Sequence, residues 1–298
     1  MIYADNAATT RMSEAAMQTM ISVMRENYGN PSSLYAFGQR SKEILEEARE
    51  TVAQVLGARS REIIFTGGGS ESDNQAIRSA AALGREKGKM HIVSTAFEHH
   101  AVLHVLERLK KEGFEVTLVD VHSDGLVRPE EVEAALREDT CLVTVMFANN
   151  EIGTVQPIRE IGEICRRRGV LFHTDAVQAL GHIPVRVDDL PVDFLSASAH
   201  KFHGPKGVGF LYARQGVRLL PLIEGGAQER GRRAGTENTA GIAAMAVALQ
   251  EAAEHLGERA EKNRPAAGSA DPGAVGDSPL RAERRPGKAS SRQCELLL

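Results

Sequence analysis

The sequence predicts an α/β fold, a three-layer sandwich in which a mostly parallel central sheet is covered by helices on both faces. From about Ile63 to Arg214, short β-branched apolar runs alternate with helical patterns, which is typical of βαβ units. The 298 residues are 42% hydrophobic and 26% charged, which is ordinary for a globular protein with a substantial core. One large domain or two medium domains are therefore expected.

Seven short apolar runs are predicted to be the strands, because each lies next to Gly, Asp or Asn turn residues. They are Ile63–Thr66, His91–Thr95, Val116–Val121, Leu142–Ala148, Val170–Thr174, Phe194–Ala197 and Val208–Tyr212.

Helices are predicted between and around these strands. Apolar residues at helical spacing indicate one helix before Gly113 and another that Gly169 terminates. The residues that define them are Leu103, Leu106 and Leu109, and then Ile158, Ile161, Ile164 and Cys165. Outside the sheet region, we expect helices at Ser13–Glu26, Gln39–Leu56 and Asn238–Lys262, the last of them rich in Ala and Leu.

Composition divides the chain into an N-terminal arm of residues 1–14, a large domain of residues 15–262 and a tail of residues 263–298. The tail consists mainly of Arg, Ala, Gly, Ser and Pro, and its four prolines exclude a long helix. It holds too little apolar surface to fold, so it is predicted to be disordered. A proline-rich linker is the alternative.

Charge and cysteine content exclude several classes of partner. A net charge of -4 and a pI near 6.2 provide no overall field toward nucleic acid or membranes, which favours a small-molecule partner. Cys141, Cys165 and Cys294 lack paired spacing, so neither a disulfide framework nor a metal site is expected. No apolar run approaches a membrane span, and Asp5 lies where a secretory signal would need an apolar run, so cytoplasmic residence is predicted.

The strongest local signal is the segment Ser196–Lys201, which follows a predicted strand and precedes the glycine-rich Gly204–Gly207. A lysine in a polar, histidine-bearing turn at a strand end could form an imine with an aldehyde cofactor. On these residues alone, a solvated loop lysine is favoured over an imine-forming one.

Other residues complete the set that a pyridoxal-type cofactor requires: a carboxylate for the ring nitrogen, donors for the phosphate and a group over the ring. Asp175 follows a predicted strand at the sheet edge where open α/β folds bind ligands, although it could be only a helix N-cap. The glycine-rich loop before Ser70 opens a helix, whose N–H groups and positive end favour an anion. Ser70 could itself be an N-cap. His99 offers an imidazole, with a capping or merely exposed histidine as the alternative.

At this point the sequence closely resembles the cysteine desulfurases of the class V aminotransferase group. The resemblance covers about residues 1–262, and the matching motifs occur in the family's order. They are Tyr3–Thr10, Gly29–Ser33, Gly67–Asn74, Glu98–His99, Asn149–Gly153, His173–Gln178, Ser198–Lys201 and Glu229–Thr236. The resemblance implies the large domain of a pyridoxal-phosphate transferase, with most of the family's small C-terminal domain missing.

The resemblance also implies a role for each matching residue. Lys201 would be the Schiff-base lysine, Asp175 the partner of the pyridine nitrogen, and His99 the residue that stacks on the ring and acts as acid and base. Gln178 would bond the ring hydroxyl, and Asn150 would lie beside ring and substrate. The residues holding the phosphate would be Gly69, Ser70, Ser198 and His200, with Ser70 in place of the commoner Thr. Thr236 would reach the phosphate in a neighbouring subunit, which implies a homodimer.

The family reaction converts L-cysteine into L-alanine and an enzyme persulfide that supplies sulfur, for example to an iron–sulfur scaffold. The persulfide forms on a cysteine in the C-terminal domain, and no segment after Lys262 resembles that loop. Cys294 has unmatched surroundings, while Cys141 and Cys165 are predicted to be inert core thiols. A frameshift or mis-specified end is one hypothesis for the changed tail.

Three functions therefore stay open. The first is a cysteine desulfurase-type enzyme whose activity is impaired, because no segment of this sequence resembles the family's cysteine loop. The second is an inactive cofactor-binding fragment or dimerisation partner. The third is another class V enzyme, such as an aminotransferase or selenocysteine lyase, which fits the segments Asn149–Gly153 and Glu229–Thr236 less well.

Overall fold

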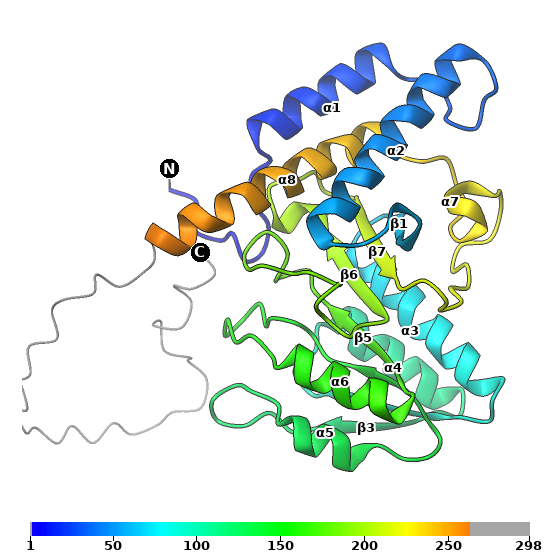
Figure 1. The fold of residues 1–298 in the computed structure, drawn as a ribbon, viewed down its shortest axis with the longest axis vertical. Helices are drawn as coiled ribbons and strands as arrows, with labels where there is room; N and C mark the ends of the chain where they lie inside the picture. Colours follow the sequence, from blue (N-terminus) through cyan, green and yellow to red (C-terminus); the bar gives the residue numbers. More distant parts are fainter. Residues whose placement is uncertain (1, 263–298) are drawn as a thin grey trace, which may run out of the picture.

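The computed structural model describes residues 2–262 as a seven-stranded sheet with helices on both faces (Figure 1). The strand order is β1-β7-β6-β5-β4-β2-β3, and every pairing is parallel except those of β7. The strands are β1 Ile63–Thr66, β2 His91–Thr95, β3 Glu115–Val119, β4 Thr140–Thr144, β5 Leu171–Asp175, β6 Phe194–Ser198 and β7 Gly209–Ala213. The predicted fold class is thus confirmed.

Strand β7 runs against its neighbours because the connection before it is short. Residues 199–208 contain only the 3-10 turn η2 (Ala199–Lys201), whereas a parallel return needs a crossover of about a dozen residues or more. The chain therefore turns back beside β6. This return places the Lys201 turn directly at the sheet edge.

The sheet separates two hydrophobic cores, and successive side chains of a strand alternate between them. Ile63 and Phe65 belong to the larger core, while Ile64 between them belongs to the smaller one. The larger core also contains Ile161 from α6, and the smaller contains Ile77 from α3. Except for β3, which lies at the sheet edge and is largely exposed, the strands are buried on both faces, which explains their nearly continuous apolar runs.

The helices lie where the hydrophobic spacing predicts them, and two short helices add to that prediction. The helices are α1 Glu14–Glu26, α2 Ala36–Leu56, α3 Gly69–Arg85, α4 His100–Lys111, α5 Pro129–Ala135, α6 Ile158–Arg168, α7 Gln228–Gly231 and α8 Thr239–Lys262, with the 3-10 turn η1 Ser60–Glu62. Helix α8 packs against α1 and α2, so its apolar residues Ile242, Met245 and Leu249 are buried (Figure 1). Among the helices of residues 2–262, none could cross a membrane.

Several element boundaries differ from the prediction. Strand β4 ends at Thr144 instead of Ala148, although the N–H groups of Val145 and Phe147 still donate to carbonyls of β5. Ala148 forms a separate antiparallel β-bridge with Val155. Strand β3 ends at Val119 instead of Val121, and α2 begins at Ala36 instead of Gln39. The tail, residues 263–298 and with it Cys294, lies outside the described residues, so its disorder stays a prediction.

Replacing Phe172, a fully buried side chain of β5, should destabilise the fold strongly. Phe172→Ala is expected to lower the free energy of unfolding by about 3–5 kcal/mol, because it leaves a cavity in the larger core. Leu118→Ala on β3, where the side chain is 40% exposed, is the matched control and should cost less than about 1 kcal/mol. Urea denaturation measures both values, and equal losses would contradict this picture of the core.

Candidate active site

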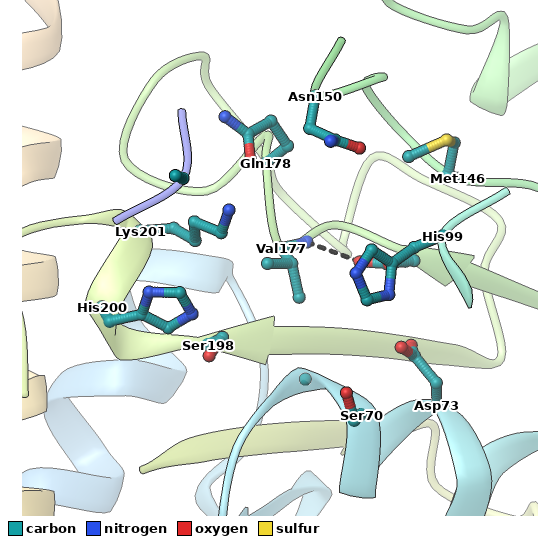
Figure 2. Close-up of a pocket in the computed structure, with 13 residues that line it drawn as sticks. Ser70, Asp73, His99, Met146, Asn150, Val177, Gln178, Ser198, His200 and Lys201 are labelled. Atoms are coloured by element: carbon teal, nitrogen blue, oxygen red, sulfur yellow. Dashed lines mark hydrogen bonds between the residues drawn. The ribbon is translucent and has the colours of Figure 1, made fainter. Parts of the chain in front are cut away.

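A cavity of about 240 Å³ lies at the carboxyl edge of the sheet (Figure 2). Its walls are Ala8, Gly69, Ser70, Asp73, His99, Met146, Asn150, Asp175, Val177, Gln178, Ser198, His200 and Lys201. Every predicted site residue except Thr236 is in this set. Thr236 is exposed in the segment before α8 and does not line this cavity.

Strand polarity brings these residues together. Asp175 ends β5 and Ser198 ends β6, while Ser70 and His99 follow the ends of β1 and β2. All four strands are oriented alike, so their carboxyl ends meet at one edge, the usual ligand-binding edge of open α/β sheets.

The glycine-rich loop after β1 is shaped by two glycines. Gly68 is the N-cap of α3 and has φ 144°, a conformation that side chains disfavour. A Cβ on Gly69 would lie 2.5 Å from Cγ2 of Val177, so any larger residue there would require the Val177 side chain to move. Ser70 lies in the first turn of α3, and the N-cap alternative for Ser70 is wrong. The free N–H groups of this turn make the loop a suitable place for an anion.

Lys201 lies in η2, where its Nζ donates a hydrogen bond to the carbonyl of Ala7. Partial burial lowers the pKa of Lys201, against the opposing attraction of Asp175. The backbone of Thr10 also donates to the carbonyl of His200 at 2.8 Å, so the N-terminal segment runs along the lysine turn. A lowered pKa increases the fraction of neutral, nucleophilic amine. Lys201 is therefore a half-buried, positioned amine and not a freely solvated one.

Asp175 and Gln178 are buried polar groups on the wall facing Lys201. One carboxylate oxygen of Asp175 accepts the N–H of Val177 at 2.9 Å. Within residues 2–262, Oε1 of Gln178 is buried without a hydrogen-bond partner. A buried acceptor of this kind normally has a partner, so the amide is available to a ligand in the cavity.

His99 combines the two interpretations that the sequence left open. Its Nδ1 accepts the N–H of Ala101 at 3.1 Å, so it caps α4, and its ring lies at the cavity (Figure 2). Because Nδ1 accepts a hydrogen bond, the proton of the neutral ring lies on Nε2. Asn150 is on the same side of the cavity, in a turn that Asn149 fixes by accepting the N–H of Glu151 at 2.9 Å.

Sequence reasoning missed four residues of the cavity wall: Ala8, Asp73, Met146 and Val177. Asp73 could have been found, because it lies three residues after Ser70 on α3 and therefore on the same helix face. Met146 and Val177 provide an apolar part of the wall, and no polar pattern in the sequence marks them.

Three buried carboxyl groups lie at or behind the cavity. Burial raises the pKa of Asp73 to about 7 and that of Glu98 to about 8. The pKa of Asp175 is also raised to about 7, mainly by burial and next by the negative charge of Asp73. Burial lowers the pKa of His173, which lies 3.5 Å from Asp73, to about 4. His173 is therefore neutral near pH 7, so it supplies no positive charge to these carboxyl groups.

The cofactor-free protein should lose stability as the pH rises from about 5 to about 8. A carboxyl whose pKa is higher in the folded state contributes stability below its unfolded pKa, and this contribution is lost as the pH rises from the unfolded to the folded pKa. For Glu98 the loss begins near its ordinary pKa of 4.5 and is complete once the pH passes the folded pKa of about 8. We expect Glu98→Gln to flatten the fall of Tm over this range, whereas Glu163→Gln on the exposed side of α6 should leave it unchanged. Thermal scans at pH 5, 6.5 and 8 measure the slopes, and identical slopes in all three proteins would refute the assignment.

Comparison with known proteins places this cavity in a family. The aminotransferase class-V model matches residues 2–267. Cysteine desulfurase IscS of Clostridium botulinum is 51% identical over 261 residues, which is 88% of this chain and 66% of the relative. The enzyme of Methanosarcina thermophila is 52% identical over 86% of this chain and 63% of the relative. The putative cysteine desulfurase IscS 1 of Bacillus subtilis is 50% identical over 88% and 69%.

Solved structures agree with these relatives. A NifS-like protein is 46% identical with a TM-score of 0.85, covering 87% of this chain and 72% of that one. SspA in complex with cysteine is 39% identical with a TM-score of 0.81, covering 84% and 72%. This chain spans about two thirds of the length of the curated relatives. It belongs to the class-V aminotransferase family and, within it, to the pyridoxal-phosphate-dependent cysteine desulfurases.

Proposed function

We propose that this chain binds pyridoxal phosphate in the cavity and carries the cofactor chemistry of L-cysteine desulfuration, which yields L-alanine and an enzyme persulfide. The observation that supports this most is the convergence of an amine, a carboxylate, an amide and a glycine-rich loop on one cavity. An iron–sulfur scaffold or another thio-cofactor pathway would receive the sulfur. The family membership and the relative solved with cysteine support the substrate class.

The residues present fit the cofactor on chemical grounds. The unpartnered Oε1 of Gln178 can accept a hydrogen bond that the ring hydroxyl donates. The carboxylate of Asp175 can keep the ring nitrogen protonated. Gly69, Ser70, Ser198 and His200 line the same part of the cavity, where backbone N–H groups, hydroxyls and an imidazole suit the phosphate. Bound there, pyridoxal phosphate would supply an electron sink for the charge that develops at the substrate α-carbon.

The remaining roles belong to the chain's own groups. The amine of Lys201 would attach the cofactor aldehyde and, once displaced by substrate, move the α-proton. Nε2 of His99 would exchange a proton with the substrate, since Nδ1 is occupied by the cap of α4. Asn150, which also lines the cavity, would orient the substrate. The third alternative is another class V enzyme. No contact among the described residues favours an aminotransferase or a selenocysteine lyase.

Lys201→Ala should abolish covalent cofactor attachment. Purified chain mixed with pyridoxal phosphate is expected to acquire a visible absorbance band that survives gel filtration, and the variant should lose it. Lys111→Ala, at the exposed end of α4, is the control and should retain the band. Borohydride reduction followed by peptide mapping identifies the modified lysine. A folded wild-type chain that binds no cofactor would refute the proposed function.

The sulfur nucleophile is the part of the reaction that the described residues do not provide. Cys141 and Cys165 are buried, and burial raises their pKa values to about 11 and about 12. Both thiols are therefore protonated and inaccessible, as predicted from the sequence. We accordingly propose that these 298 residues bind cofactor but desulfurate cysteine weakly or not at all.

The cysteine assay tests this second part. With cofactor, L-cysteine and dithiothreitol, alanine formation is expected to stay near the rate of free pyridoxal phosphate, and Cys294→Ser should not change it. Cys165→Ala is the matched control for loss of a buried thiol. Rapid alanine formation that disappears in Cys294→Ser would identify Cys294 as the nucleophile and contradict the proposal.

We further propose a homodimer in the cytoplasm, in which Thr236 contributes to the neighbouring cofactor site. Two features support the dimer: Thr236 is exposed away from its own cavity, and aromatic residues Tyr28, Tyr35 and Phe37 are exposed together near the start of α2. In a dimer, Thr236 would face the neighbouring cofactor site, and the exposed aromatic side chains would be covered by the other subunit.

A further inference from the structure

The segment between β7 and α8 contains an unusual backbone. Glu229 and Arg230 in α7 are consecutive non-glycine residues in the left-handed region, with φ of 46° and 59°. Each costs about 1 kcal/mol or more relative to a right-handed conformation. Such a conformation persists only where surrounding contacts stabilise it, so contacts with other parts of the chain must hold this segment.

The first tie is a buried ion pair with α2. Two guanidinium nitrogens of Arg49 donate to the Glu229 carboxylate at 2.7 and 2.8 Å, and the N–H of Phe65 donates at 3.0 Å. The side chains of Arg49 and Glu229 are 5% and 2% exposed. With three donors on the carboxylate and the Phe65 ring beneath the guanidinium, this pair is satisfied and rigid.

The second tie reaches the glycine-rich loop. Nε of Arg233 donates to Glu71 at 2.9 Å and a terminal nitrogen donates at 3.3 Å. The same Glu71 carboxylate accepts the N–H of Gly67 at 2.7 Å. Glu71 thus joins the backbone at the start of the loop to the guanidinium of the segment. Nearby on α3, Gln75 donates to the carbonyl of Arg232 at 2.7 Å.

Glu71 lies beside the cofactor cavity, in an adjoining pocket that Ser70 and Ser198 also line. It does not line the cavity that contains Lys201, but it holds the backbone of Gly67, one residue before Gly68 and two before Gly69. Removing Arg233 would leave this carboxylate with a single backbone donor and freedom to turn toward water. The glycine-rich loop would then lose the contact that fixes where its N–H groups point.

We propose that Glu71 and Arg233 are positioning residues that fix the glycine-rich loop for the cofactor phosphate, and that they lock this loop to the segment carrying Thr236. This inference rests on the proposed function, since it needs a phosphate at the loop. The glycine-rich loop of one site is then joined rigidly to Thr236, the residue proposed to reach the cofactor of the neighbouring subunit.

The test compares two ligands, pyridoxal phosphate and pyridoxal, by equilibrium titration of the full chain and its variants. Wild type should bind the phosphorylated form more tightly. Arg233→Gln should lower that affinity about tenfold, equivalent to roughly 1.4 kcal/mol, with pyridoxal binding unchanged. A general packing defect would weaken both ligands alike. Arg233→Lys, which keeps one charge but not the two-point contact, should recover part of the difference.

The controls separate this inference from its foundation. Arg218→Gln breaks the exposed pair with Glu86 and should change neither affinity. Glu71→Gln, combined with Arg233→Gln, should cost no more than either variant alone, since one contact is lost in each case. Unchanged discrimination in folded Arg233→Gln and Glu71→Gln would overturn the positioning role alone. A wild type with no preference for the phosphorylated ligand would overturn the proposed function and this inference together.

Discussion

The site depends on a constraint of strand direction. In a parallel sheet every strand ends at the same edge, and the residues after those ends must leave the core and turn. Here that edge gathers groups separated by more than a hundred positions, from Ser70 to Lys201. The antiparallel strand β7 also contributes to the site. The short connection before it holds Lys201 in a tight turn at this edge. Packing of the apolar strands thus brings polar groups from distant parts of the chain to one edge of the sheet.

Much of this arrangement could be predicted from the sequence because the signals are local. The seven strands are short apolar runs bordered by turn residues, and Gly169 ends α6 in a left-handed conformation as a C-cap should. The site residues occur at strand ends, where both strand polarity and family motifs pointed to them.

Other features could not be predicted because they depend on contacts far apart in the chain. Nothing in the local pattern of Leu142–Ala148 indicates that the regular strand stops at Thr144, while Ala148 pairs instead with Val155. The direction of β7 follows from a connection length and not from its composition. The left-handed pair at Glu229 and Arg230 would not be expected of charged residues, and it exists because Arg49, on another helix, holds the carboxylate.

The hydrogen bond between Lys201 and the carbonyl of Ala7 has a consequence for the N-terminal segment. An amine that attaches an aldehyde loses hydrogens and can no longer serve that carbonyl in the same way. Loading the site would therefore release one of the contacts that hold residues near Ala7, while the Thr10 contact with His200 would remain. Amide hydrogen exchange of the first ten residues would then act as a built-in reporter of occupancy, on a stretch of chain that carries no cofactor chemistry of its own.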